Sequence, residues 1–124
     1  MDTIALWIGR GLSVLAVLFF IMDSVMKLVR TQVSVAATVG LGYGDAQVVP
    51  IGITLLVCTA LYAFPRTAFL GAILLTGYLG GAVASNIRAG SPVFNCAFPI
   101  IFAAIAWAGL ALRDPRIQAL ILAR

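Results

Sequence analysis

The stretch TAFLGAILLTGYLGGAVASNI, from Thr67 to Ile87, contains twenty-one residues without a charge. Arg66 precedes it and Arg88 follows it. A helix needs about 20 apolar residues to cross the hydrocarbon core of a bilayer, because it rises only about 1.5 Å per residue. The stretch therefore predicts a transmembrane helix over residues 67–87.

Small residues recur at intervals of four within this helix. Gly77, Gly81 and Ser85 fall on one face, and Arg88 lies close to the end of the same line. Small side chains in a membrane helix allow the backbone of a second helix to approach closely. We therefore predict that this face packs against another helix, and the pattern itself does not indicate a ligand.

The composition of the whole chain agrees with a membrane protein. Of 124 residues, 63% are hydrophobic and 10% are charged, and the mean hydropathy is +1.14. A soluble domain of this length cannot bury so much apolar surface, so a lipid bilayer is the expected surrounding. The net charge of +4 comes from cations that are scattered singly, which argues against a nucleic-acid partner and fits loop charges that set membrane orientation.

Three further membrane helices are expected, at about residues 4–29, 48–64 and 94–112. The connection through Pro65 and Arg66 is so short that the helices on either side of it must be antiparallel neighbours. The segment before residue 48 includes GLGYGDA, which is too rich in glycine for a lipid-exposed span and predicts a short amphipathic surface helix or loop. The predicted fold is all-α, a single integral membrane four-helix bundle over residues 1–124 with short loops.

The two ends of the chain are expected on the same side of the membrane. That side carries five cations, and the other side carries three, Lys27, Arg30 and Arg88. The five are Arg10, Arg66, Arg113, Arg116 and Arg124. The excess predicts cytoplasmic N and C termini. No small-x-small cleavage pattern follows the first apolar run, so we expect that helix to be retained, and the tail from Ile117 to Arg124 is expected along the membrane surface.

The sequence does not indicate a metal site or a hydrolytic centre. Cys58 and Cys96 have no CxxC spacing, the chain has no histidine, and a disulfide between the two is disfavoured because they fall at different depths. No serine or cysteine has a recognisable activating base. We therefore assign no catalytic residue and no metal, and we expect no catalytic activity from this chain alone.

Charged residues near the end of the first helix form the main candidate site. Asp23, Lys27 and Arg30 are spaced by four and three residues and share one face, and Arg88 emerges on the same side of the membrane. An unpaired carboxylate at this depth would be costly, so a contact between Asp23 and Arg88 is predicted. The cluster is either an ion-pair network that fixes how the first and third membrane helices dock, or a ligand, proton or quinone site.

Further polar residues are predicted to line a pocket that opens at the non-cytoplasmic end. They are Tyr43, Asp45, Tyr78, Ser85, Asn86, Asn95 and Cys96. Asn86 is about 180° from Gly77 around the helix and is expected to face elsewhere.

Four segments together resemble the DoxX-like family of small membrane proteins. They are LFFIMDSVMKL at residues 18–28, Gly42-Tyr43, residues 65–84 and RDPR at residues 113–116. The resemblance implies a four-helix protein of the bacterial inner membrane, in a family named after a subunit of a thiosulfate:quinone oxidoreductase. It also implies histidine at the position of Asn86 and glycine at that of Ser24 in many members. This chain lacks that histidine, which removes the one side chain there that could titrate near neutrality or bind a metal.

The expected function is that of a membrane subunit, anchor or assembly factor for a protein partner, such as an oxidoreductase. One alternative is a redox subunit that binds quinone or lipid in the outward pocket. Another is a small-molecule carrier. Carriers are commonly built from larger repeated halves, so a lone four-helix chain would then have to form a homo-oligomer.

Overall fold

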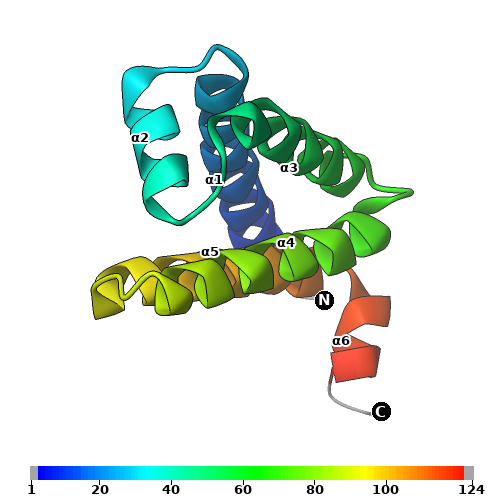
Figure 1. The fold of residues 1–124 in the computed structure, drawn as a ribbon. Coiled ribbons are helices and arrows are strands. Elements are labelled where there is room, and N and C mark those ends of the chain that lie inside the picture. The colour runs from blue at the N-terminus through cyan, green and yellow to red at the C-terminus, as the bar shows by residue number, and fades with distance from the viewer. Residues whose placement is uncertain (1–2, 122–124) are drawn as a thin grey trace.

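The computed structural model describes residues 3–121 and consists of helices joined by short connections (Figure 1). The elements are α1 (Thr3–Leu28), α2 (Gln32–Gly40), the short 3-10 helix η1 (Asp45–Gln47), α3 (Val48–Ala63), α4 (Ala68–Arg88), α5 (Val93–Arg113) and α6 (Pro115–Ile121). Four of these, α1, α3 (with η1), α4 and α5, are long and apolar enough to cross a membrane. The predicted all-α fold with four membrane helices is confirmed, and α2 is the predicted short helix between the first two.

Each long helix packs against two neighbours, so the four form a ring. α1 contacts α3 and α5, and α4 contacts the same two helices, which places α1 and α4 on a diagonal. The predicted antiparallel pair, α3 and α4, is confirmed as a set of neighbours joined by the turn after Ala63. Figure 1 shows two helix pairs, one formed by α1 and α3 and the other by α4 and α5. The two pairs diverge towards the end where α2 lies.

Small residues bring the two helix pairs together at the opposite end, which we call the closed end. A Cβ atom added to Gly71 of α4 would collide with the backbone of Tyr62 in α3. A Cβ atom added to Gly109 of α5 would lie 2.9 Å from the amide nitrogen of Ser13 and 3.0 Å from the carbonyl oxygen of Gly9, both in α1. Glycine is therefore required where these backbones touch, as is common between membrane helices.

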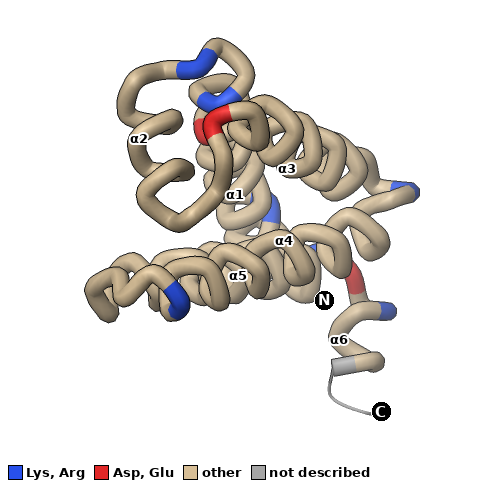
Figure 2. Tube along the Cα trace, in the orientation of Figure 1, with Lys and Arg blue, Asp and Glu red and all other residues tan. Residues whose placement is uncertain are grey.

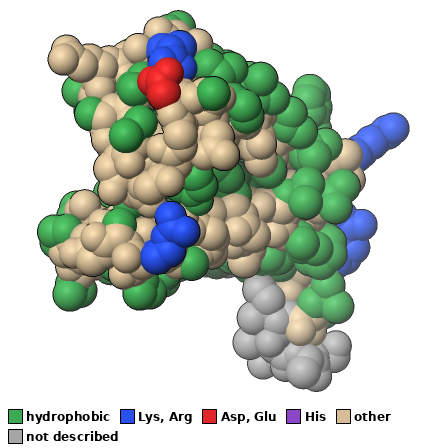
Figure 3. Space-filling view, in the orientation of Figure 1, with side chains coloured by type: hydrophobic (Ala, Val, Ile, Leu, Met, Phe, Trp, Pro, Cys, Tyr) green, Lys and Arg blue, Asp and Glu red, His purple; other side chains and the backbone are tan. Residues whose placement is uncertain are grey.

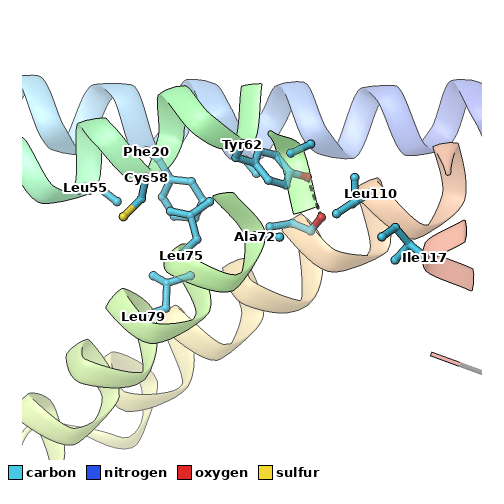
Figure 4. Packing of buried hydrophobic residues seen from close by; sticks show 12 residues of the cluster. Phe20, Leu55, Cys58, Tyr62, Ala72, Leu75, Leu79, Leu110 and Ile117 are labelled. Carbon is cyan, nitrogen blue, oxygen red and sulfur yellow. Dashed lines mark hydrogen bonds between the residues drawn. The ribbon is translucent and has the colours of Figure 1, made fainter. Parts of the chain in front are cut away.

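A chain of hydrogen bonds crosses the closed end. The Tyr62 hydroxyl donates to the carbonyl oxygen of Ala106 over 2.6 Å, the bond drawn dashed in Figure 4. Since the Tyr62 hydroxyl proton is used in this bond, the Ser13 hydroxyl donates to the Tyr62 oxygen (3.0 Å). Arg113 Nε in turn donates to Ser13 Oγ (3.0 Å). Tyr62 is fully buried, so the bonds satisfy polar groups that would be costly to leave unpaired. They connect α1, α3 and α5.

The apolar core follows the line where the four helices meet (Figure 4). Its larger side chains are Phe20, Leu55, Tyr62, Leu75, Leu79 and Leu110. Ile117 of α6 also belongs to this core and is 4% exposed, because the start of α6 contacts α5. The burial of Ile117 does not test whether the tail lies along the membrane surface, so that placement stays a prediction, and the last residues of the tail, 122–124, lie outside the described chain.

The surface is that of a membrane protein. Figure 2 shows that most charged residues lie near helix ends and connections, and Figure 3 shows hydrophobic side chains exposed on the visible face of the molecule. Large apolar side chains that are at least 40% exposed occur on all four long helices, among them Leu18, Val57, Leu74 and Ile100. In water this exposure would be unfavourable, whereas lipid satisfies it. The chain is a small multi-pass membrane protein.

Candidate functional site

A cavity of about 610 Å³ lies where the two helix pairs diverge, at the end that we call the open end. Its walls come from α1, α3, α4 and α5, and α2 with the loop after it lies over one side. In the space-filling view the molecule is indented between the α2 region and the α4–α5 pair, with hydrophobic side chains in the depth of the indentation (Figure 3). A volume of this size is typical of small-molecule sites.

Aromatic rings form one wall of the cavity. Phe94, Phe98 and Phe102 are four residues apart on α5 and therefore share a face, and all three line the cavity. Phe19 of α1 stacks on Phe102 with ring centroids 4.1 Å apart, and Phe20 meets the same ring edge-on at 5.8 Å. These rings contact one another between α1 and α5. The wall suits an apolar tail or a flat ring.

An ion pair on α1 also faces the cavity. Lys27 Nζ lies 2.6 Å from Asp23 Oδ1, one helical turn away on α1, and the two side chains are 14% and 32% exposed. The position of Lys27 depends on Gly52 of α3, because a Cβ atom there would lie 2.8 Å from the Cβ of Lys27. The pair therefore lies where α1 and α3 touch, and both residues line the cavity.

Most other polar side chains around the cavity are satisfied by their own helix. Thr38 donates to the carbonyl oxygen of Ser34, Thr54 to that of Pro50, and the Asn86 amide to that of Ala82, each four residues back. Such bonds give a hydroxyl or amide group a hydrogen-bond partner in an apolar surrounding. These residues therefore give the wall polarity, and of their donors the second amide N–H of Asn86 stays unused in the described chain.

Three further side chains that line the cavity retain donors for a ligand within the described residues, those of Asn95, Lys27 and Tyr78. Lysine has three N–H groups, and within residues 3–121 that of Lys27 uses one of them, on Asp23. The Tyr78 hydroxyl has no hydrogen-bond partner among the residues that the structure describes, although it lines the cavity and lies within electrostatic range of Asp23 and Tyr43. The side chains of Lys27, Asp23 and Tyr78 can thus bind a polar head group together.

The loop after α2 is tied to α4 at the edge of the cavity. The Tyr43 hydroxyl and Ser85 Oγ are 2.6 Å apart, and since Ser85 donates to the carbonyl oxygen of Gly81, Tyr43 is the donor of this bond. Arg88 Nη2 donates to the carbonyl oxygen of Leu41 over 3.4 Å. Gly42 between them has φ +99, a conformation that favours glycine. The loop therefore forms a side wall that the short Tyr43–Ser85 bond and the longer Arg88–Leu41 bond hold in place.

The structure brings together part of the predicted polar pocket. Asp23, Lys27, Tyr43, Tyr78, Ser85, Asn86 and Asn95 all line the cavity. Asp45 is instead exposed at the surface and pairs with Arg30, whose Nη2 donates to both carboxylate oxygens over 2.7 Å. Cys96 is also outside the cavity lining, and it and Cys58 are free thiols.

The predicted contact between Asp23 and Arg88 is wrong. Within residues 3–121 the ion-pair partner of Asp23 is Lys27, and Arg88 reaches the loop at Leu41. The reason is the ring arrangement, which places α1 and α4 on a diagonal. The Asp23–Lys27 pair is therefore internal to α1 and does not dock the first membrane helix against the third.

The glycine face of α4 also differs from its prediction. A Cβ atom added to Gly77 or Gly81 would meet nothing within 4 Å in the described chain, and both residues border the cavity. Ser85, the third member of this face, bonds to Tyr43. Asn86 was expected to face away from Gly77, but the cavity is wide enough to include both. The small residues leave space here and do not pack against a helix of the same chain.

Sequence reasoning missed the aromatic wall and the closed end. The spacing of Phe94, Phe98 and Phe102 is a helical signal that could have revealed the wall. Pro99 also lines the cavity, and because proline has no N–H, the carbonyl oxygen of Asn95 lacks its usual helical donor. The hydrogen bond between Ser13 and Tyr62, by contrast, joins residues far apart in the chain and has no local sequence signature.

These features define a class, a four-helix membrane protein with a partly polar cavity between its helices. The sequence model of the DoxX-like family matches residues 11–109, and the chain belongs to this family. The match covers α1 from its third turn to the end of α4 and most of α5, so every wall of the cavity lies within it. Searches of curated proteins and of solved structures give no match.

Proposed function

We propose that this DoxX-like protein is an accessory membrane subunit that binds a small amphipathic molecule, of the quinone or lipid type, in the cavity at its open end. The observation that carries the proposal is the pairing of an aromatic wall with unfilled polar groups inside a membrane helix bundle. Phe98 and Phe102 offer an apolar surface, and Lys27 and Tyr78 offer donors that the described protein leaves unused. Apolar walls with a few convergent polar groups are typical of ligand sites.

The role of membrane subunit, anchor or assembly factor remains part of the proposal. A partner, such as an oxidoreductase, would deliver or receive the bound molecule, and no reaction is proposed for this chain itself. The carrier alternative is weaker, because a carrier must open its site alternately to both sides. The closed end is sealed by the contacts of Gly71 with Tyr62 and of Gly109 with Ser13, which would all have to separate.

We further propose a bacterial inner-membrane location with cytoplasmic termini. Arg10, Arg66, Arg113 and Arg116 lie at the closed end of the described chain, against Lys27, Arg30 and Arg88 at the open end. The positive-inside rule then directs the cavity towards the non-cytoplasmic side. Fusions to the C terminus test this: green fluorescent protein should fluoresce and alkaline phosphatase should be inactive. The reverse pattern would contradict the orientation.

Ligand binding can be tested by filling the cavity. Gly81 borders it, and a Cβ atom there meets no described atom within 4 Å, so Gly81→Phe should place a ring in the cavity without a backbone clash. Gly80→Phe is the matched control, because Gly80 is equally open but does not line the cavity. Organic extracts of the wild type and the control should contain a quinone or lipid in stoichiometric amount, and that of Gly81→Phe should not. Equal amounts in all three extracts would count against the proposal.

A further inference from the structure

The cavity has one charge of each sign. Among the residues that line it, Asp23 is the one anion and Lys27 the one cation, and they are in contact at 2.6 Å. The described cavity therefore presents no net charge to a molecule inside it. This balance differs from that of the protein as a whole, which has a net charge of +4.

From this balance we infer that the cavity selects an uncharged head group, and that the Asp23–Lys27 pair sets this selection. The inference rests on the proposed function and names the chemistry of its ligand. An anionic head could approach Lys27 only beside the carboxylate of Asp23, and a cationic head could approach Asp23 only beside the ammonium of Lys27. Like charges at this range repel strongly away from bulk water, so both kinds of ion are disfavoured.

A neutral head with a carbonyl or hydroxyl group meets neither repulsion. It can accept from an unused N–H of Lys27 or from the Tyr78 hydroxyl, and a hydroxyl can also donate to the second oxygen of Asp23. The tail or ring then lies along the phenylalanines of α5. Quinones and neutral glycerides share this chemistry.

Charges outside the cavity do not change this conclusion. Arg30 is paired with Asp45 and both are exposed. Arg88 is exposed at the rim, where its guanidinium lies against the loop at Leu41 and Gly42. Solvent and salt screen exposed charges, so Arg88 can attract anions to the entrance without compensating one at Lys27.

The test compares amphiphiles that share a tail and differ in head charge. Lauroyl glycerol, laurate and dodecylamine compete with a photoreactive lauroyl glycerol for the purified full chain in nonionic detergent, at a mildly alkaline pH where laurate is ionised and the amine is protonated. A decyl benzoquinone is included to separate a quinone ligand from a glyceride. The neutral probes should bind at least about tenfold more tightly than both ions. Equal binding of either ion would overturn the inference.

Two variants should move the selectivity in opposite directions. Asp23→Asn leaves Lys27 without its counter-charge and should raise the relative affinity for laurate, and Lys27→Gln should raise that for dodecylamine. Arg66→Gln, in the exposed turn at the closed end, should leave the order unchanged. If the folded variants do not show these opposite shifts in relative affinity, the proposed role of the Asp23–Lys27 pair is overturned. If no probe competes on the wild type, the proposed function itself fails, and if all compete without regard to charge, only the selectivity fails.

Discussion

The two ends of the helix bundle use small residues in opposite ways. At the closed end Gly9, Gly71 and Gly109 allow backbones to touch, and a buried chain of hydrogen bonds through Tyr62 connects three helices. At the open end Gly77 and Gly81 meet no described atom within 4 Å where a Cβ would stand, and they border a cavity. A glycine in a membrane helix therefore marks either a contact or a space, and only the neighbouring helix decides which.

The polar groups of the two ends differ in the same way. The Tyr62 hydroxyl has both a donor and an acceptor from the protein, whereas the hydroxyl of Tyr78 has none within residues 3–121. The first arrangement stabilises the fold, and the second is available for a ligand. Substitutions matched between the two ends can therefore separate stability from binding.

The largest effect is expected for Gly71→Ala at the closed end. Its methyl group would collide with the α3 backbone at Tyr62, and overpacking of this kind costs about 1–3 kcal/mol or more of the free energy of unfolding. Gly80→Ala on the same helix has open space and should be neutral within about 0.5 kcal/mol. Thermal unfolding in detergent measures both, and equal melting temperatures would show that the α3–α4 contact is looser than described.

The second-largest effect on stability is expected for Tyr62 at the closed end, and Tyr78 at the open end provides the comparison. Tyr62→Phe leaves the Ser13 hydroxyl and the Ala106 carbonyl without their partner and should lower the free energy of unfolding by about 1–3 kcal/mol. Tyr78→Phe removes a hydroxyl that has no partner in the described chain, so stability should hardly change while the affinity for lauroyl glycerol falls up to about tenfold. Thermal unfolding and probe competition on both variants provide the comparison. A Tyr78→Phe protein with wild-type affinity would remove Tyr78 from the binding site.

A smaller effect is expected where the loop is tied to α4. Tyr43→Phe and Ser85→Ala break the same bond, and each should cost about 0.5–1.5 kcal/mol, mostly as local opening. Amide hydrogen exchange should rise in residues 41–45 and remain unchanged around Tyr62. Because the two variants delete one bond, their double variant should resemble either single one. Additive effects would mean that the hydroxyls act separately.

The smallest effect concerns pH at the closed end. Hydrogen bonding from the Arg116 side chain lowers the pKa of Asp114, which precedes α6. A lowered pKa in the folded state means that the ionised carboxylate contributes stability above the ordinary aspartate range of about 3.9, and this contribution is lost as the pH falls through the lowered value. The difference in melting temperature between the wild type and Asp114→Asn should therefore shrink on acidification. A constant difference would show that the charge contributes nothing.

The fold was largely predictable because membrane helices are encoded locally. Each span is a long apolar run, and the charges at residues 66 and 88 limit α4 in the sequence as they do in the structure. The loop around Gly42 was predictable for the same reason, since its glycines exclude a lipid-exposed span.

The site was only partly predictable because it depends on which helices are neighbours. Asp23 and Lys27 are one turn apart, so their pairing follows from spacing. Whether Asp23 contacts Arg88 or faces a cavity depends on the order of the helices around the ring. The spacing of residues in the sequence does not contain that order. The sequence predicts Gly77 and Gly81 as packing residues because their partner cannot be inferred from α4 alone.

Mapping the site of photolabelling tests the central claim most directly. The photoreactive lauroyl glycerol is crosslinked to the wild-type chain in detergent, with and without an excess of unlabelled probe, and the modified residues are identified by mass spectrometry. The account predicts labelling of cavity residues such as Tyr78, Phe98 and Phe102 that the excess removes. Labelling confined to outward-facing residues such as Leu74 and Ile100, unaffected by competition, would contradict it.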